Sequence, residues 1–367
     1  MKIVCPYCFE KFSPSEVLYR CTNVSASCTN EKDEAMNKFW GDSRLYKRII
    51  RPKKSLFGGM PKSAKCSCGN ESQNTVCPHC HNDLPREMVE KGGTIISIVG
   101  AWGSGKTTYI TTLIYELTQK GHSLNIGALP TFVGISNDEC TGVRYENDFF
   151  NILYKQKVCP GATKLDYRCE IPLIYKLYST AKDKHIYLVF HDKPGEYFHD
   201  TKKCKNILNN SDGIIMLMDI FDEQAGHNNL IQNIISYFDE QPDNYKKPFA
   251  IALSKIDAVI SNNNTPLPGI SLNANSGYLD GGGYDVKEME SVDMSIRAGL
   301  ESWGEKPLID NINAQVRFNR KAKFFGISAL GSSPNDRYEI EKIKPFRVLD
   351  PLIWILYSLK FPLLIKK

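Results

Sequence analysis

The sequence of 367 residues lacks the features that direct a chain into a membrane or out of a cell. No apolar stretch precedes Cys5, so the start of the chain does not resemble a secretory leader. The apolar run 352–359 is followed by Lys360 and Pro362 and is too short to cross a bilayer. A strong charge of one sign is also missing, because 46 Lys and Arg residues are balanced by 41 Asp and Glu residues. We therefore expect a cytoplasmic protein that does not contact membranes.

Cysteine is scarce in most of the chain but not at its beginning. Eight of the 12 cysteines precede residue 81, whereas the other four are scattered. In a reducing compartment, clustered cysteines indicate metal binding more often than disulfides, and eight thiolates suit two closed, structural Zn²⁺ sites. The simplest pairing is sequential, although a crossed pairing that joins the two Cys-Pro-x-Cys turns remains open. In the sequential pairing, one ion is held by Cys5, Cys8, Cys21 and Cys28, and the other by Cys66, Cys68, Cys77 and Cys80.

Residues 1–90 are predicted to form a zinc-ribbon-like module whose folding depends on its metal. The basic run 44–54 inside this module suggests nucleic-acid binding as one interpretation. However, residues 1–90 contain 14 Lys and Arg against 10 Asp and Glu, a net charge of +4. Eight thiolates with two zinc ions would contribute about −4 and cancel this charge. We therefore favour a protein partner for the module over nucleic acid.

A glycine-rich turn between a buried strand and a helix dominates the middle of the sequence. Residues 95–99 are mostly apolar and β-branched, and helical spacing of apolar residues follows from 109 to 117. Between them, residues 100–107 match the Gly-x-x-x-x-Gly-Lys-Thr pattern of a phosphate-binding P-loop. Its backbone N–H groups can surround phosphates that Lys106 neutralises, and the Thr107 hydroxyl is expected to bind Mg²⁺. The expected nucleotide contacts are Gly100, Gly103, Ser104, Gly105, Lys106, Thr107 and Thr108.

A second motif, which contains two acidic residues, follows two strand-like runs. These runs, 170–178 and 185–190, are predicted to form an antiparallel pair. The second run leads directly into His-Asp-Lys-Pro-Gly-Glu. An acidic residue just after a buried strand is where a P-loop enzyme holds Mg²⁺, so Asp192 is assigned that role. The N–H group of Gly195 can approach a γ-phosphate, and the carboxylate of Glu196 can help to position the attacking water.

The nucleotide base is predicted to bind after two later strands. The strand-like run 249–253 ends in Ser-Lys-Ile-Asp, where the carboxylate of Asp257 can accept two hydrogen bonds from the N1–H and N2–H₂ edge of guanine. Adenine lacks this donor pair, and the stem of Lys255 can lie over the base plane. After a last strand at 322–327, the backbone N–H groups of Ser328 and Ala329 are placed to bind guanine O6.

These stretches, in this order, resemble the Ras-like GTPases over about residues 93–360. The resemblance implies an α/β P-loop NTPase fold, with a mostly parallel sheet and helices on both faces, in a domain of residues 91–367. It also implies that Thr163 is the switch threonine that closes over Mg²⁺ and the γ-phosphate. Two residues depart from the family pattern. Ser254 replaces the usual Asn or Thr, with a hydroxyl that can still tie this loop to the P-loop, and Glu196 replaces the glutamine that orients water.

A narrower resemblance is to the bacterial double-GTPase proteins of conflict and defence gene neighbourhoods. It depends on the N-terminal cysteines, the loop 100–108, Asp-x-Pro-Gly-Glu at 192–196 and Ser-Ala-Leu-Gly at 328–331. Together, these resemblances imply a GTP-hydrolysing, Mg²⁺-dependent switch whose zinc module recruits a partner protein. Two alternatives remain: an ATPase of the same fold, suggested by Ser254, and a slow-turnover nucleotide-sensing scaffold, suggested by Glu196.

Overall fold

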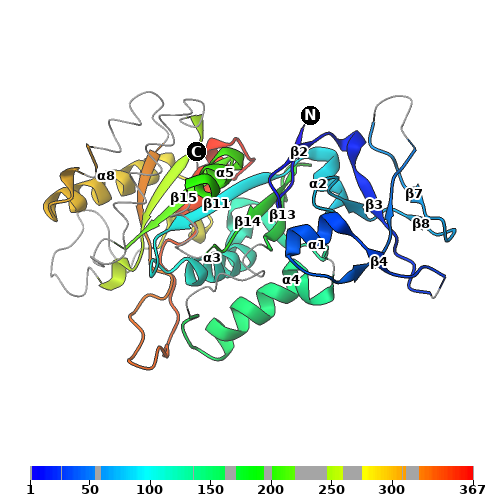
Figure 1. Cartoon of the computed structure of the whole chain (residues 1–367). Coiled ribbons are helices and arrows are strands. Elements are labelled where there is room, and N and C mark those ends of the chain that lie inside the picture. Colours follow the sequence, from blue (N-terminus) through cyan, green and yellow to red (C-terminus); the bar gives the residue numbers. More distant parts are fainter. Residues whose placement is uncertain are drawn as a thin grey trace.

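Figure 1 shows the computed structural model of the chain, in which an N-terminal part made of short strands lies beside a seven-stranded sheet with helices. The structure describes residues 2–25, 27–53, 59–134, 136–161, 171–193, 201–219, 246–258, 275–307, 309–310 and 322–366. Among the helices in these ranges, none combines the length and the apolar character needed to span a bilayer.

The N-terminal part consists of short strands and two short helices. Its largest sheet has the order β10-β9-β3-β6, and it also contains the two-stranded sheets β1-β2, β4-β5 and β7-β8. Such short elements bury little apolar surface, so a part of this size depends on additional cross-links. The elements are β1 (Ile3–Val4), β2 (Lys11–Phe12), β3 (Leu18–Arg20), β4 (Glu31–Lys32), α1 (Glu34–Trp40), β5 (Leu45–Tyr46), β6 (Ile49–Ile50), β7 (Ala64–Lys65), β8 (Glu71–Ser72), β9 (Thr75–Val76), β10 (Asp83–Leu84) and α2 (Arg86–Lys91).

The central sheet has the strand order β12-β13-β14-β11-β15-β16-β17. The five strands from β14 to β17 in this order are parallel, whereas β13 is antiparallel to both β14 and β12. Strands β15 and β16 are buried along their whole length, which explains their continuous apolar sequences. The strands are β11 (Thr94–Gly100), β12 (Ile126–Pro130), β13 (Leu173–Ser179), β14 (His185–Phe190), β15 (Gly213–Met218), β16 (Phe249–Leu253) and β17 (Ala322–Gly326).

Helices cover the sheet on both faces (Figure 1). Helix α3 (Lys106–Lys120) follows directly from the P-loop, and α5 (Thr201–Asn210) packs on β11. Helix α10 (Asp350–Ser358) packs on β15 and β16, and α8 (Val286–Ser302) packs on β17. Helix α4 (Thr141–Arg144) continues into a π-helix, Tyr145–Lys155, that packs on α3. The predicted α/β sheet with a P-loop between strand and helix is therefore present.

The N-terminal part packs on the face of the sheet opposite α3, over β11 and β14. Successive side chains of a strand point to opposite faces. Ile95 and Val189 belong to the apolar cluster of the N-terminal part, whereas their neighbours Ile96, Leu188 and Phe190 belong to the cluster that contains the apolar side chains of α3. The cysteine-rich part therefore covers one sheet face at β14 and the start of β11, a position that helices occupy elsewhere on this sheet.

Most elements of the sheet domain begin and end close to the residues expected from the sequence. The runs 185–190 and 249–253 are strands over those residues, and the antiparallel pair of β13 and β14 is confirmed. The first strand of that pair begins at Leu173 instead of residue 170. The apolar run near the end forms α10, whose side chains Leu352, Ile355 and Leu356 are buried.

Gly213 marks a close approach between the sheet and α10. A methyl group on Gly213 would lie only 2.6 Å from Cγ2 of Ile355. We expect Gly213→Ala to lower the free energy of unfolding by about 1–3 kcal/mol, because the core cannot accept the added carbon without a shift. The measurement is urea unfolding followed by circular dichroism.

The double variant tests whether this collision is the cause. Ile355→Ala alone should cost about 2–5 kcal/mol through the cavity it leaves. Combined with Gly213→Ala, it removes the methyl group that collides, so the double variant should lose less stability than the two single variants together. Strictly additive losses would contradict this explanation.

Candidate nucleotide and metal sites

The eight thiols of the N-terminal part gather in two groups of four, and the sequential pairing expected from the sequence is wrong. The first thiol group consists of Cys5, Cys8, Cys77 and Cys80, and the second thiol group consists of Cys21, Cys28, Cys66 and Cys68. The two Cys-Pro-x-Cys turns therefore meet at one site, which is the crossed pairing.

Strand pairing between distant segments causes this crossing. Strand β3 pairs with β9, so the chain just before Cys21 lies beside the chain just before Cys77. A buried ion pair between Arg20 and Asp83, with 2.8 Å between Nε and Oδ1, fixes β3 against β10 as well. Because β3 and β9 are antiparallel, Cys21 and Cys77 lie at opposite ends of this pairing and join different thiol groups. Proximity in sequence does not decide which turns meet.

Both thiol groups are compact enough for a tetrahedral zinc site, with all four sulfur atoms of each group within 4.8 Å of one another. Four Zn–S bonds of about 2.3 Å place the sulfur atoms about 3.8 Å apart. The sulfur–sulfur distances are 3.7 Å for Cys5–Cys80, 3.9 Å for Cys8–Cys77, 3.7 Å for Cys21–Cys68 and 4.0 Å for Cys28–Cys66. Burial raises the pKa of Cys5 and of Cys80, so protons must leave these thiols when a metal binds. Each group can hold a structural ion with no open coordination position.

The P-loop joins β11 to α3 with its glycines in the left-handed region. Gly103 and Gly105 have φ angles of 78° and 79°, which glycine adopts without strain. The Lys106 ammonium donates to the carbonyl oxygens of Gly100 and Ala101, at 2.9 Å each, and therefore lies over the loop. A phosphate bound in this loop would meet both this ammonium and the N-terminus of α3.

Two of the residues predicted to hold Mg²⁺, Thr107 and Asp192, lie together beside the P-loop. Because β11 and β14 are neighbouring parallel strands, the residues that follow them share one edge of the sheet. The Thr107 hydroxyl donates to the Asp192 carboxylate, with distances of 2.9 and 3.2 Å to its two oxygens. Hydroxyl and carboxylate oxygens are the ligands that Mg²⁺ prefers in NTPase sites. The pair therefore fits this ion.

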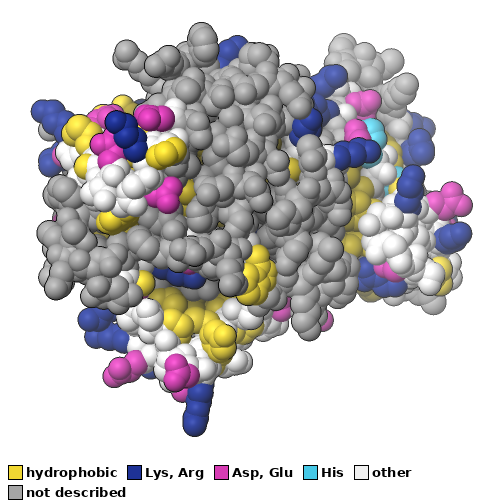
Figure 2. Space-filling model, turned by 60° about the vertical axis from the view of Figure 1, so that its left-hand side comes forward, with side chains coloured by type: hydrophobic (Ala, Val, Ile, Leu, Met, Phe, Trp, Pro, Cys, Tyr) yellow, Lys and Arg dark blue, Asp and Glu magenta, His cyan; other side chains and the backbone are white. Residues whose placement is uncertain are grey.

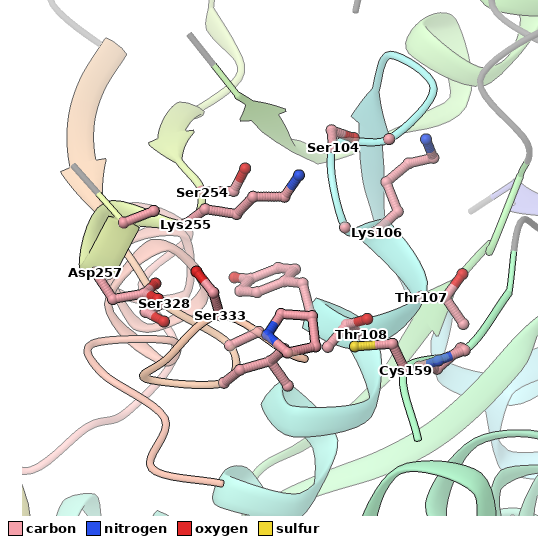
Figure 3. Close-up of a pocket in the computed structure, with 18 of the residues that line it drawn as sticks. Ser104, Lys106, Thr107, Thr108, Cys159, Ser254, Lys255, Asp257, Ser328 and Ser333 are labelled. Atoms are coloured by element: carbon pink, nitrogen blue, oxygen red, sulfur yellow. The ribbon is translucent and has the colours of Figure 1, made fainter. Parts of the chain in front are cut away.

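A cavity of about 530 Å³ extends from the P-loop to the predicted base-binding residues. Its volume lies within the usual range for small-molecule sites. Figure 3 shows Lys106 and Thr107 at one end and Asp257 and Ser328 at the other. The cavity is lined by all predicted nucleotide contacts except Gly100, namely Gly103, Ser104, Gly105, Lys106, Thr107, Thr108, Lys255, Asp257, Ser328 and Ala329.

The base end of the cavity is held by contacts to the neighbouring strand β15. Lys255 Nζ lies 2.6 Å from Oδ2 of Asp219, the residue after β15. The Ser254 hydroxyl donates to the carbonyl of Met218 at 3.2 Å, so it ties this loop to β15 and not to the P-loop as expected. The Ser328 N–H donates to the carbonyl oxygen of Phe346 at 3.0 Å, so it is not directed toward a base as expected.

One wall of the cavity could not be predicted from motifs. It includes Cys159, Pro160 and Tyr338, which come from two segments joined by a β-bridge between Val158 and Glu339. The Cys159 N–H donates to the Tyr338 carbonyl at 2.8 Å, and burial raises the pKa of the Cys159 thiol. The only signal in the sequence is a Cys-Pro-Gly turn, which is also common in loops without a site.

Three predicted site residues, Thr163, Gly195 and Glu196, lie outside the described residues.

Comparison with known proteins defines the class of this domain. Residues 80–257 match the family described as the KAP family P-loop domain. The matched range includes both the P-loop and Asp257, and the cavity joins these two parts. The chain therefore contains a P-loop NTPase domain.

Similar proteins include one of nearly the same length. The "Putative ESX-1 scaffolding and assembly protein SaeC" of Mycolicibacterium smegmatis is 24% identical, and the match covers 96% of this chain and 97% of that protein. Among solved structures, the GTP-bound GTPase-like domain of Ski7 from S. cerevisiae is 16% identical, with a TM-score of 0.36 and coverage of 73% and 50%. The complex of SsGBP with GDP is 13% identical, with a TM-score of 0.27 and the same coverage. The match thus spans half the length of either structure.

The first prediction from these sites concerns the two thiol groups. Metal analysis of the purified protein should find about two zinc ions per chain. Cys8→Ser should remove one ion, because it breaks the first thiol group, whereas Cys204→Ser on α5 should keep both. A protein with no zinc and with disulfides in the N-terminal part would contradict this.

The second prediction concerns the phosphate end of the cavity. Lys106→Ala should weaken triphosphate binding about 30-fold or more, because it removes a charged hydrogen-bond donor, and should abolish hydrolysis. Binding is measured with a fluorescent nucleotide, and hydrolysis by phosphate release. The control is Lys120→Ala at the other end of α3, where the ammonium pairs with Glu116. Equal effects of the two substitutions would show that this loop is not the phosphate site.

Proposed function

We propose that the protein is a GTP-binding molecular switch that hydrolyses GTP with Mg²⁺. The observation that carries this proposal is the single cavity that joins the P-loop to Asp257 and the segment 328–330. A nucleoside triphosphate of ordinary length fits such a site, with its phosphates on the loop and its base between the two later segments. The match to a KAP family P-loop domain supports nucleotide binding or hydrolysis and is equally consistent with ATP.

At the phosphate end, the residues of this chain have separate tasks. Lys106 neutralises the β- and γ-phosphates, and Thr107 and Asp192 hold Mg²⁺, which balances phosphate charge when bound. The resemblance to Ras-like GTPases gives Thr163 the role of closing over the metal and Gly195 that of contacting the γ-phosphate through its N–H. Glu196 would position the water that attacks in line.

At the base end of the cavity, the carboxylate of Asp257 and the residues around it favour guanine. Asp257 lies at the cavity wall and is 7% exposed, so a hydrogen bond to its carboxylate is shielded from water. The ion pair with Asp219 holds Lys255 along the same wall, where its stem can cover the base. The backbone after Ser328 adds N–H donors for guanine O6.

The proposal is tested by exchanging the base acceptor. Asp257→Asn should weaken GTP binding roughly 30- to 1000-fold, because a charge-assisted pair of hydrogen bonds is lost. Xanthosine triphosphate should bind this variant better than GTP does, since its base offers an acceptor to the new amide. Competition of each nucleotide against a fluorescent analogue provides the measurement. If ATP competes with the unaltered protein as well as GTP does, the ATPase alternative is correct.

The N-terminal part is proposed as a partner-binding module of residues 1–90 with two structural Zn²⁺ ions, joined to a GTPase domain of residues 91–367. Eight thiols available for metal suit a reducing, cytoplasmic compartment. In the view of Figure 2, the described surface carries both basic and acidic side chains. The net charge of +4 for residues 1–90 would be cancelled by eight thiolates with two zinc ions, which favours a protein partner over nucleic acid. The resemblance to bacterial double-GTPases suggests that the switch regulates a conflict or defence system.

A second candidate function is a nucleotide-sensing scaffold with slow turnover. It is favoured by the full-length match to a protein named for scaffolding and assembly. Single-turnover kinetics separates the two candidates, because a switch releases phosphate on the timescale of its signal whereas a scaffold retains the triphosphate.

A further inference from the structure

The loop of the first thiol group touches the strand end that carries the proposed Mg²⁺ ligand. The imidazole Nε2 of His191 lies 2.7 Å from the carbonyl oxygen of Pro6, which stands between Cys5 and Cys8. The ring of Phe9 lies against the same imidazole, with 5.1 Å between centroids. Because a carbonyl oxygen can only accept, Nε2 carries the proton of this hydrogen bond. His191 is 2% exposed, so water does not compete for the bond.

Strand geometry connects this contact to the nucleotide site. Along β14, Val189 faces the N-terminal part and Phe190 faces the α3 side. Continued alternation directs His191 to the N-terminal part and Asp192 to α3. The observed contacts agree, because His191 meets Pro6 whereas Asp192 meets Thr107 on α3. Two adjacent residues therefore bind two different parts of the chain from opposite faces of the sheet.

The position of the Pro6 carbonyl is set by the thiol group around it. The N–H of Phe9 donates to the carbonyl of Cys5 at 2.9 Å, and the N–H of Cys5 donates to Glu10 at 3.0 Å, so the turn is closed on itself. Cys5 and Cys8 then anchor the turn to Cys77 and Cys80 across the small sheet. A metal ion in the first thiol group would fix the Pro6 carbonyl. Loss of that ion would release the turn.

We propose that His191 is a positioning residue that holds Asp192 in place for Mg²⁺, and that the metal in the first thiol group acts on the nucleotide site through the bond between His191 and Pro6. This inference rests on the proposed Mg²⁺-dependent nucleotide binding but not on the identity of the base. The second thiol group, which includes Cys68, has no such contact to β14 among the described residues.

The experiment measures the Mg²⁺ concentration that half-saturates binding of a fluorescent guanosine triphosphate analogue to the full chain. His191→Leu should raise this concentration about tenfold, because the strand end loses its anchor and the Pro6 carbonyl stays buried without a donor. Nucleotide affinity without added Mg²⁺ should stay within about twofold, and the zinc content should remain at two ions. His191→Gln should restore most of the Mg²⁺ affinity, because its amide can donate from the position of Nε2. If His191→Leu acted only by lowering stability, the hydrogen bond restored by His191→Gln would not recover the Mg²⁺ affinity.

Two matched variants test the route from the metal. Cys8→Ser and Cys68→Ser replace the half-buried thiol of each group, and each should cost one zinc ion. Cys8→Ser should shift the Mg²⁺ requirement as His191→Leu does, and the two substitutions together should shift it no further. Cys68→Ser should shift it less than threefold, and His185→Leu at the start of the same strand should leave it unchanged.

Unchanged Mg²⁺ dependence of His191→Leu would overturn the inference, as would equal shifts from Cys8→Ser and Cys68→Ser. Absence of nucleotide binding by the unaltered protein would instead overturn the proposed function together with this inference. A preference for ATP would correct only the proposed base, since the same titration with an ATP analogue still decides the role of His191.

Discussion

The nucleotide site depends on the parallel pairing of β11 with its two neighbours. On one side, β14 pairs Val189 with Ile95 and thereby brings Asp192 to Thr107. On the other side, β15 pairs Leu217 with Gly100, so Asp219 comes to lie beside the P-loop edge and holds Lys255. The side chains of the site come from several loops. The register of β14, β11 and β15 brings these loops together. A shift of register by one residue would turn Asp192 to the wrong face of the sheet.

The phosphate site could be predicted from the sequence because all its parts are local. A strand, a glycine turn and the first helical turn are adjacent in the chain, and the chemistry of Lys106 and Thr107 follows from their place in the turn. The Asp192 contact was also predictable, because a strand whose last four residues are buried and apolar or aromatic ends two residues before it. The pairing of the thiols was not, because β3 and β9 are far apart in the sequence and nothing local specifies that they pair.

Two further features escaped prediction for the same physical reason. The cavity wall formed by Cys159 and Tyr338 requires a β-bridge between two segments that are far apart in the sequence. The packing of the N-terminal part on β11 and β14 requires part of one sheet face to be left uncovered by the helices of the sheet domain. Both depend on which surfaces remain to be buried after the sheet has formed, and no short motif encodes that. The predicted division into residues 1–90 and 91–367 stays a prediction, and the two parts share an apolar cluster that includes Val89, Ile95 and Val189.

The crossed thiol groups are nested, since the segments of Cys5 and Cys77 enclose those of Cys21 and Cys66 along the chain. Closing a loop costs more entropy when the loop is longer, so the inner group is the easier one to close first. Once it is closed, fewer free residues separate the ends that the outer group must join. Loop closure therefore favours assembly of the inner thiol group before the outer one, by less than about 0.6 kcal/mol. During synthesis, the outer ion can be captured only after Cys80 has emerged, shortly before the P-loop strand is made.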